Sequence, residues 1–352
     1  MFCARPYPGR RSRAATLNIR SFRMVPVTAS VVMALATGCG TAISTAPSAG
    51  HPDPELPDIT VAALPAADLA GLYIAQDEGL FTGQGLQVTI EPIASSQAVI
   101  TAQLKGEVDI SAGSYIPYLA AQAAGASFRV LAEASTLRPD TRVLVTTGNS
   151  PVVTVAQLKG KKVAVNGTNS IGTLLINVLL SDHGISPAKV HFVTDGQGFP
   201  AMPAQLQTGT WTAAFLAEPY ITYAGEKYGE RILADLDQGS AVNFPIDGYV
   251  ATTAWAQKYP RTAAAFVRAI QAAQLLADTN SATVQAAIAK YDNLGPLVTT
   301  SMALAGYPTG PVNKGRLQRV ALAMLRFGML HPRYAAEVEQ GTLVGSMVGP
   351  AS

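Results

Sequence analysis

A strand, a tight turn and a helix follow one another at residues 59–79, and this unit constrains the fold more than any other stretch of the chain. The apolar run at 59–64 predicts a buried strand. The next apolar residues recur at steps of three and four, which predicts a helix with Asp68 as its N-cap and Gly79 as its end. In an open α/β sheet the turn of such a unit lies at the carboxyl edge, where the helix offers unpaired N–H groups to a ligand. We therefore expect residues 65–69 to form one wall of a binding site.

The same alternation of strand and helix continues along the chain. Further strands are expected at residues 86–92, 108–111, 128–132, 143–147, 163–165, 190–194, 212–216, 232–234 and 249–253. Helices are expected at residues 95–105, 115–124 and 171–182, after Pro200, and throughout the segment that follows Pro260. This order predicts an α/β fold with mostly parallel sheets flanked by helices, and a helical C-terminal layer.

The length of the chain predicts two lobes. With 352 residues, of which 48% are hydrophobic and 14% charged, it is too long for one compact core of ordinary size. A polar Gly/Pro break at 148–151 predicts the first hinge, and the chain is expected to cross back near 244–248. These breaks give a first lobe of residues 59–147 plus 249–352, which includes the C-terminal helices, and a second lobe of residues 148–248.

Residues 1–38 resemble a lipoprotein-type signal peptide. Six arginines precede an uncharged run at 24–38 that is too short to span a membrane. The run ends in Leu-Ala-Thr-Gly before Cys39, which resembles the lipobox of bacterial lipoproteins, except that Ala36 stands where leucine is usual. We expect Cys39 to carry the lipid, and residues 39–58, rich in Thr, Ser, Ala, Gly and Pro, to be a flexible tether.

Alternatives to this N-terminal interpretation remain open. One alternative is that an ordinary secretory signal peptide is cleaved here and that Cys39 carries no lipid. The Arg10-Arg11 pair leaves twin-arginine export open, and a start at Met24 would remove most of the positive residues.

Composition excludes several functional classes. The net charge is only +2 and the basic residues are scattered beyond the N-terminus, so no nucleic acid is expected as a partner. The four histidines are isolated, and Cys3 and Cys39 are the only cysteines, so no metal site, disulfide or catalytic thiolate is expected. The glycines at 167–173 lack the lysine of a phosphate loop, and Pro200 interrupts a dinucleotide-like pattern at 196–201. We expect no cofactor and no catalytic residue.

Polar and aromatic residues stand at the ends of successive predicted strands. Two sheets that present such turns to each other enclose a cleft. The candidate ligand-binding residues are Asp68, Leu69, Ser95, Ser96, Gln97, Ser114, Tyr115, Asn166, Thr168, Asn169, Glu218, Tyr220 and Phe244.

The charges in these turns favour one class of ligand. No Lys or Arg occurs in them, whereas Asp68 and Glu218 do, which favours a neutral or nitrogen-bearing cationic ligand such as an aminopyrimidine or an amine. The helix that follows residues 166–170 has an N-terminus that would suit an anion, so sulfonate or nitrate is the alternative. Asp68 has a second open role as a helix cap, and Glu218 as an acceptor of hydrogen bonds within its own turn.

Five segments carry a resemblance to a known family. They are Leu-Tyr-Ile-Ala-Gln-Asp-Glu-Gly-Leu-Phe at 72–81, Leu-Lys-Gly-Glu-Val-Asp at 104–109, Leu-Lys-Gly-Lys at 158–161, Asn-Gly-Thr at 166–168 and Ala-Glu-Pro-Tyr at 217–220. In order and spacing they resemble the solute-binding proteins of ABC importers for nitrate, sulfonates and thiamine pyrimidine precursors. The resemblance implies a type II periplasmic-binding-protein-like fold and capture of one small molecule between two lobes, without catalysis. It also implies a monomer outside the cytoplasm, anchored to the cell membrane, that serves an ABC permease and its ATPase subunits.

Two other functions share this architecture. One is an enzyme of thiamine pyrimidine synthesis, but that group is marked by a cysteine-rich stretch with a histidine, and the chain has no cysteine after Cys39. The other is a ligand sensor that signals through a partner protein.

Overall fold

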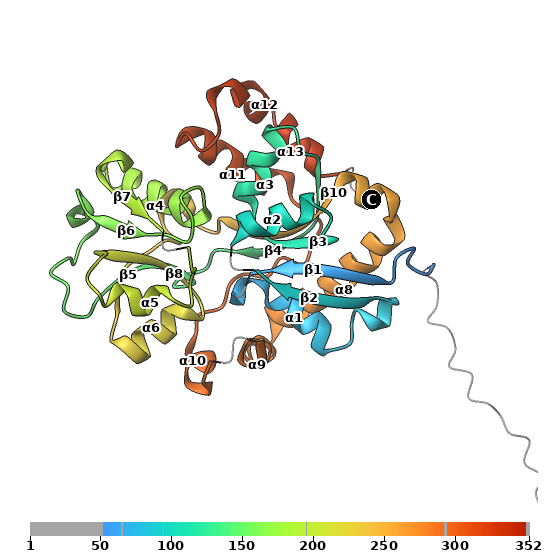
Figure 1. Cartoon of the computed structure of the whole chain (residues 1–352), viewed down its shortest axis with the longest axis horizontal. Helices are drawn as coiled ribbons and strands as arrows, with labels where there is room; N and C mark the ends of the chain where they lie inside the picture. Colours follow the sequence, from blue (N-terminus) through green and yellow to red (C-terminus); the bar gives the residue numbers. More distant parts are fainter. Residues whose placement is uncertain (1–51, 65, 94, 195, 292–293, 350–352) are drawn as a thin grey trace, which may run out of the picture. The chain divides into compact units, whose positions relative to one another are not determined.

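The computed structural model describes residues 52–349 except 65, 94, 195, 292 and 293. The expected signal peptide, Cys39 and the first part of the tether lie outside the described residues, as does Pro65. Within the described part, the chain forms two five-stranded sheets with helices packed around them (Figure 1). None of the helices described is both long enough and apolar enough to cross a membrane.

The first sheet contains the strand that opens the repeating unit. Its strands, in spatial order, are β2 (Gln87–Pro92), β1 (Asp58–Ala63), β3 (Ile110–Ser114), β10 (Pro245–Thr252) and β4 (Phe128–Thr136). β1 is parallel to β2 and β3, whereas β10 is antiparallel to β3 and β4. Four strands therefore run in one direction, and only the strand that returns from the second sheet is reversed.

The second sheet repeats this arrangement. Its order is β7 (His191–Val193), β6 (Lys162–Ala164), β8 (Ala213–Ala217), β5 (Arg142–Thr146) and β9 (Arg231–Asp235). β6 is parallel to β7 and β8, and β5 is antiparallel to β8 and β9. Here too the reversed strand is the one that crosses from the other sheet. The predicted two-lobed α/β fold with mostly parallel sheets is confirmed.

The crossing point differs from the one expected. We expected the strand at 143–147 to belong to the first lobe, but β5 pairs within the second sheet. The chain therefore passes between the sheets at residues 137–141, before the Gly/Pro break at 148–151. The Val-Leu-Val centre of the strand would fit either sheet, so its composition does not reveal which one it joins. We propose lobe boundaries that follow the sheets, with β5 in the second lobe.

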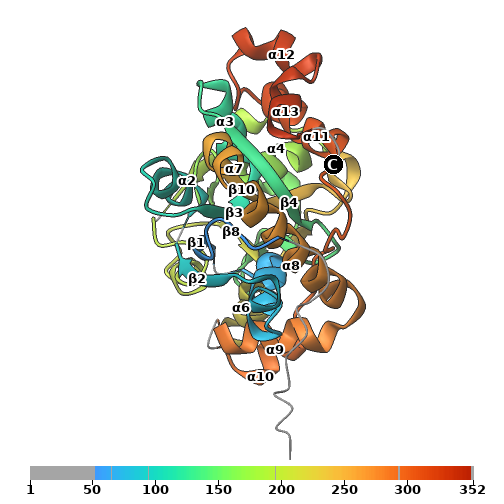
Figure 2. The same cartoon turned by 90° about the vertical axis from the view of Figure 1, so that its right-hand side faces the viewer.

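Helices cover both sheets. On the first sheet α1 (Ala70–Asp77) and α8 (Pro260–Thr279) lie on one side, and α2 (Ser96–Leu104) and α3 (Tyr115–Ala123) on the other (Figure 1). On the second sheet α4 (Ile171–Asp182) lies opposite α5 (Met202–Leu206) and α6 (Tyr220–Tyr228). The remaining helices are α7 (Thr253–Lys258), α9 (Ser281–Tyr291), α10 (Pro296–Ser301), α11 (Lys314–Arg326), α12 (Ala335–Glu339) and α13 (Thr342–Met347). In Figures 1 and 2, α12 and α13 lie together at one end and α9 and α10 at the other.

The C-terminal helices form the packing layer that the sequence predicts. α8 contacts α1 and β4, and its Phe266 and Ile270 are fully buried. α11 buries Leu317, Val320 and Met324 and contacts α3 of the first lobe and α4 of the second. Its apolar residues recur at steps of three and four, so one face of the helix contributes to a core shared by both lobes.

Two local expectations are wrong. Asp68 is not the N-cap of the first helix, because it lies inside a short 3-10 helix, η1 (Ala67–Leu69), and α1 begins only at Ala70. The strand expected at 108–111 is β3, which begins at Ile110 and continues to Ser114, and the Ser114 side chain caps α3.

Candidate functional site

The predicted turns of the first sheet meet at its carboxyl edge. Ser95 caps α2, because its Oγ accepts a hydrogen bond from the Ala98 N–H at 3.2 Å. The Ser96 Oγ accepts another from the Ser114 N–H at 3.3 Å, which joins the start of α2 to the end of β3. A Cβ at Gly113 would lie only 3.0 Å from that Ser96 oxygen, so a larger residue there would force Ser96 to move by a few tenths of an ångström.

The first predicted turn also touches the second lobe. The Ala67 N–H donates to the Glu218 carbonyl oxygen at 3.2 Å, and the Tyr307 hydroxyl donates to the Ala67 carbonyl oxygen at 2.8 Å. Glu218 precedes Pro219 through a cis peptide bond, directly after β8. The structure thus brings the turns after β1 and β8 into contact across the two lobes.

A buried ion triad lies beside this contact. The Arg142 Nη2 is 2.8 Å from the Asp68 Oδ2 and 3.2 Å from the Asp247 Oδ2. All three side chains are at most 4% exposed. The Ser135 hydroxyl donates to the same Asp247 oxygen at 3.3 Å, and the Phe215 ring centre lies 5.8 Å from the guanidinium carbon. Among the described residues the Arg142 Nε has no hydrogen-bond partner.

Burial dominates the electrostatics of the triad. It raises the pKa of Asp68 above its ordinary value even though the Arg142 charge opposes the shift. Burial likewise raises the pKa of Asp247 to about 7, with the Arg142 charge lowering it and the Asp68 charge raising it further. Two carboxylates and one guanidinium carry a net charge of −1, which one proton neutralises.

Glu218 is satisfied within the structure. Its carboxylate accepts hydrogen bonds from the Thr222 N–H at 3.1 Å, the Thr222 hydroxyl at 2.8 Å and the Ala303 N–H at 3.2 Å. Burial raises its pKa, and these hydrogen bonds oppose that shift. The sequence left two roles open for Glu218, ligand binding and acceptance of hydrogen bonds within its own turn. In the structure both carboxylate oxygens already accept hydrogen bonds from the protein.

Aromatic rings line the edge of the second lobe. The Phe199 ring centre lies 5.7 Å from that of Phe215 and 6.4 Å from that of Tyr220. Gly172 at the start of α4 packs directly on Phe215, since a Cβ there would lie 2.4 Å from the ring. Tyr220 was predicted at this edge, whereas Phe199 and Phe215 were not.

Tyr115 occupies the corresponding place in the first lobe. Its ring packs on Gly248 of β10, where a Cβ would lie 2.5 Å from a ring carbon. Its hydroxyl is buried, and no group in the described part of the chain bonds to it. Burial, with the Glu133 charge next in importance, raises the pKa of this phenol well above its ordinary value.

The other predicted residues are spread over different environments. Leu69 and Phe244 are buried in the core, and the Arg319 guanidinium carbon lies 5.4 Å from the Phe244 ring centre. Asn166 is half-buried, and its Oδ1 has no hydrogen-bond partner among the described residues. Gln97, Thr168 and Asn169 are exposed.

Sequence reasoning missed the charge that matters most here. The candidate turns contain no Lys or Arg, as the sequence shows, but Arg142 reaches Asp68 from β5, 74 residues further along the chain. The available signal was a charged residue directly before the apolar run Val-Leu-Val of a buried strand, a position that water does not reach.

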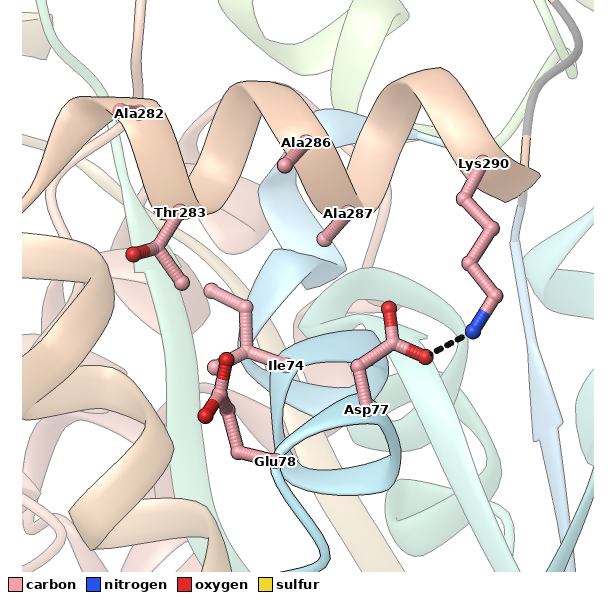
Figure 3. A pocket seen from close by; sticks show the side chains of 8 residues that line it. All are labelled: Ile74, Asp77, Glu78, Ala282, Thr283, Ala286, Ala287 and Lys290. Atoms are coloured by element: carbon pink, nitrogen blue, oxygen red, sulfur yellow. Dashed lines mark hydrogen bonds and ion pairs between the residues drawn. The ribbon is translucent and has the colours of Figure 1, made fainter. Parts of the chain in front are cut away.

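Two cavities lie elsewhere on the first lobe. The larger, of about 420 Å³, is formed by α1 and α9, where Asp77 is paired with Lys290 and the apolar floor includes Ile74 and Ala286 (Figure 3). The other, of about 290 Å³, lies before β3, where the Trp255 indole N–H donates to Asp109 at 2.9 Å. Within the described part of the chain, none of the predicted ligand-binding residues lines either of these two cavities.

Comparisons with known proteins agree with this architecture. The model of the family described as "NMT1/THI5 like" matches residues 66–280. The chain is 33% identical over 157 residues to an Escherichia coli (strain K12) protein named "Putative aliphatic sulfonates-binding protein", a match that covers 44% of this chain and 46% of that protein. The chain spans less than two thirds of the length of the curated relatives it matches.

Solved structures share the fold. The alkanesulfonate-binding protein SsuA from Xanthomonas axonopodis pv. citri, solved with MOPS bound, is 18% identical with a TM-score of 0.69, over 86% of this chain and all of that one. The periplasmic nitrate-binding protein NrtA from Synechocystis PCC 6803 is 15% identical with a TM-score of 0.71, over 84% of this chain and 87% of that one. The desulfurization enzyme DSZB also has this fold, at 15% identity and a TM-score of 0.60, over 81% of this chain and 98% of that one.

Proposed function

The chain belongs to the NMT1/THI5-like family, and on that premise we propose that it is the solute-binding component of an ABC-type importer. The observation that carries the proposal is the contact between the Ala67 N–H and the Glu218 carbonyl, which joins the strand-end turns of two separate lobes. Two sheets linked by crossing strands, with their carboxyl-edge turns in contact, are suited to hold a small molecule by hinge closure.

The proposed ligand is a small anion, with aliphatic sulfonates first and nitrate second. The argument for a cationic ligand depended on two unpaired carboxylates, but Asp68 is paired with Arg142 and Glu218 is satisfied by three hydrogen bonds. Without that argument, the N-terminus of α4 after residues 166–170 favours an anion. The names of the sulfonate- and nitrate-binding relatives support the same class.

Both lobes supply the proposed contacts. Ser96 and Tyr115 would contact the ligand from the first lobe, and Asn166, Thr168 and Tyr220 from the second. Two of these side chains carry buried polar atoms that lack a partner within the described chain, the Tyr115 hydroxyl and the Asn166 amide oxygen. Since buried polar atoms are costly when unbonded, both are suited to bond a ligand.

We propose that the protein acts outside the cytoplasm, anchored to the cell membrane through a lipid on Cys39. The tether at 39–58 would then let the two lobes reach an ABC permease with its ATPase subunits. Mass spectrometry of the protein from membranes tests the anchor, because a lipid on Cys39 adds the mass of its acyl chains to the N-terminal peptide.

We also propose that the protein binds its ligand without converting it. The fold is shared with a desulfurization enzyme, so the distinction needs a direct test. An unchanged sulfonate recovered after long incubation supports a binding protein, and release of sulfite would identify an enzyme.

Calorimetric titration of the full chain tests the central proposal. The panel holds short alkanesulfonates, taurine, nitrate, aminopyrimidines and polyamines. A 1:1 complex with a sulfonate or nitrate, weakened in Asn166→Ala and unchanged in the exposed lobe variant Lys189→Ala, is the expected result. Binding of an amine alone would overturn the ligand class, and no binding across the panel would count against a solute receptor.

A further inference from the structure

The triad of Asp68, Arg142 and Asp247 joins the two lobes. The Arg142 backbone belongs to the second sheet, where it pairs with Ala217 of β8. Asp247 lies in β10 of the first sheet, and Asp68 follows β1 of that sheet in η1. One guanidinium nitrogen from the second lobe therefore bridges two carboxylates of the first, at 2.8 and 3.2 Å.

The surroundings do not supply a second cation. The Ser135 hydroxyl donates a hydrogen bond to Asp247. Apart from Arg142, the titratable groups of the described chain that interact with the two aspartates are tyrosine phenols and one glutamate. They are Glu218 before α6, Tyr307 after α10, Tyr249 in β10, and Tyr115 and Tyr118 in α3. A buried net charge of −1 is costly, and it disappears when one proton binds the carboxylate pair.

We propose that this triad positions the lobes in their closed arrangement, and that closure takes up one proton on the Asp68–Asp247 pair. The inference rests on the proposed function, because it describes how the lobes of the same site close. When the lobes separate, Arg142 moves away from the aspartates and water reaches them, so each carboxyl returns toward its ordinary acidity. Closing the lobes expels that water and makes the neutral triad the favoured state.

The sign of the pH dependence follows from the two states. The closed form holds the proton up to a pH of about 7, whereas an aspartate in contact with water releases it near pH 4. Between these values closure binds a proton, so the ratio of closed to open protein falls as the pH rises, by up to about tenfold per pH unit. Above pH 7 the ratio no longer depends on this pair.

Energy transfer between dyes on the two lobes measures closure without any ligand. In the full chain, with Cys3 and Cys39 replaced by serine, one dye is attached at Gln87→Cys in β2 and the other at Lys189→Cys beside β7, both exposed positions. The wild-type distance is expected to lengthen as the pH rises from 4.5 to 7 and then to stay constant. A distance that does not change with pH overturns the proposal.

Variants separate the triad from other acids. Asp247→Asn carries a neutral side chain of the same shape, so its lobes are expected to stay closed at every pH, and Asp68→Asn is the second variant if Asp247→Asn does not fold. Glu230→Gln is the matched control, because burial raises the pKa of Glu230 to about 7 in the second lobe, where it accepts from Gln207. Its pH profile of closure is expected to equal that of the wild type.

Two further outcomes decide the proposal. A wild-type profile in both aspartate variants overturns it, and so does loss of the pH dependence in Glu230→Gln. Because the experiment contains no ligand, its failure is distinct from a failure of the ligand titration, which tests the solute-binding function itself.

Discussion

The two sheets have the same topology but different chemistry at their carboxyl edges. Each has four strands in one direction and a reversed crossing strand in the fourth position, β10 in one and β5 in the other. The first edge gathers the carboxyl groups of Asp68 and Asp247, whereas the second presents the rings of Phe199, Phe215 and Tyr220. The shared topology therefore puts the strand ends of each sheet at one edge, and individual side chains determine the chemistry of that edge.

The crossing strands connect these two environments. β5 begins with Arg142, which carries its charge from the second sheet into the acidic edge of the first. The first edge is held by electrostatics and the second by ring packing. Perturbing each edge separately tests whether this contrast is real.

The largest effect is expected at Arg142. Replacing it with methionine leaves two carboxylates buried without a cation, which should cost about 3–5 kcal/mol of unfolding free energy. Urea denaturation at pH 7 measures the loss. The triple variant Arg142→Met, Asp68→Asn, Asp247→Asn removes all three charges and should recover most of it, and a single variant as stable as the wild type would show that the triad does not hold the first edge.

Gly172 probes the aromatic edge. An alanine Cβ there would lie 2.4 Å from the Phe215 ring, so Gly172→Ala should overpack this edge and cost about 1–3 kcal/mol. The control is Gly225→Ala in α6, where the Cβ would lie 3.8 Å from the Glu230 carbonyl oxygen and the change should be neutral or slightly stabilising. Equal stability of the two variants in thermal unfolding would mean that Phe215 moves aside freely.

Glu230 gives the second lobe a pH dependence of its own. Its pKa in the folded protein is raised from 4.5 to about 7 by burial, so its contribution to stability is fully present below pH 4.5 and is lost as the pH rises through 7. As the pH rises from 4.5 to 7, the unfolding free energy of the wild type should therefore fall relative to that of Glu230→Gln, by up to about 1.4 kcal/mol per pH unit. Denaturation curves at pH 4.5, 5.5, 6.5 and 7.5 measure it, and a constant difference would contradict the assignment.

The smallest effects are expected at the helix caps, where the two lobes are alike. Ser95 caps α2 in the first lobe and Ser170 caps α4 in the second, each through its Oγ. Each serine-to-alanine change should cost about 1 kcal/mol. A loss several times larger in one lobe, measured by urea denaturation, would show that its serine does more than cap a helix.

The sequence predicts regular elements well where local patterns decide them. The helix at 171–182 agrees with α4 at both ends, because Ser170 caps its start and Gly184, in the left-handed region, follows its end. The helix expected at 95–105 agrees with α2 within one residue at each end, with Ser95 as its N-cap. These features depend only on residues within a few positions of one another.

Long-range pairings were not readable in the same way. Asp68 has the position and chemistry of a helix cap, yet its carboxylate pairs with Arg142, 74 residues away. The membership of β5 in the second sheet also depends on its partners β8 and β9, which its own sequence does not specify. The premise of the ligand-charge argument, that Asp68 and Glu218 have no partners, failed for the same reason, since it counted only charges local to each turn.

Hydrogen exchange of the full chain with and without a bound sulfonate tests the central claim most directly. If the ligand is held between the lobes, backbone amides at residues 66–69 and 113–116 of the first lobe and at 166–173 and 217–222 of the second should all exchange more slowly in its presence. Protection confined to one lobe, or to α1 and α9 around the cavity of Figure 3, would contradict capture between the lobes.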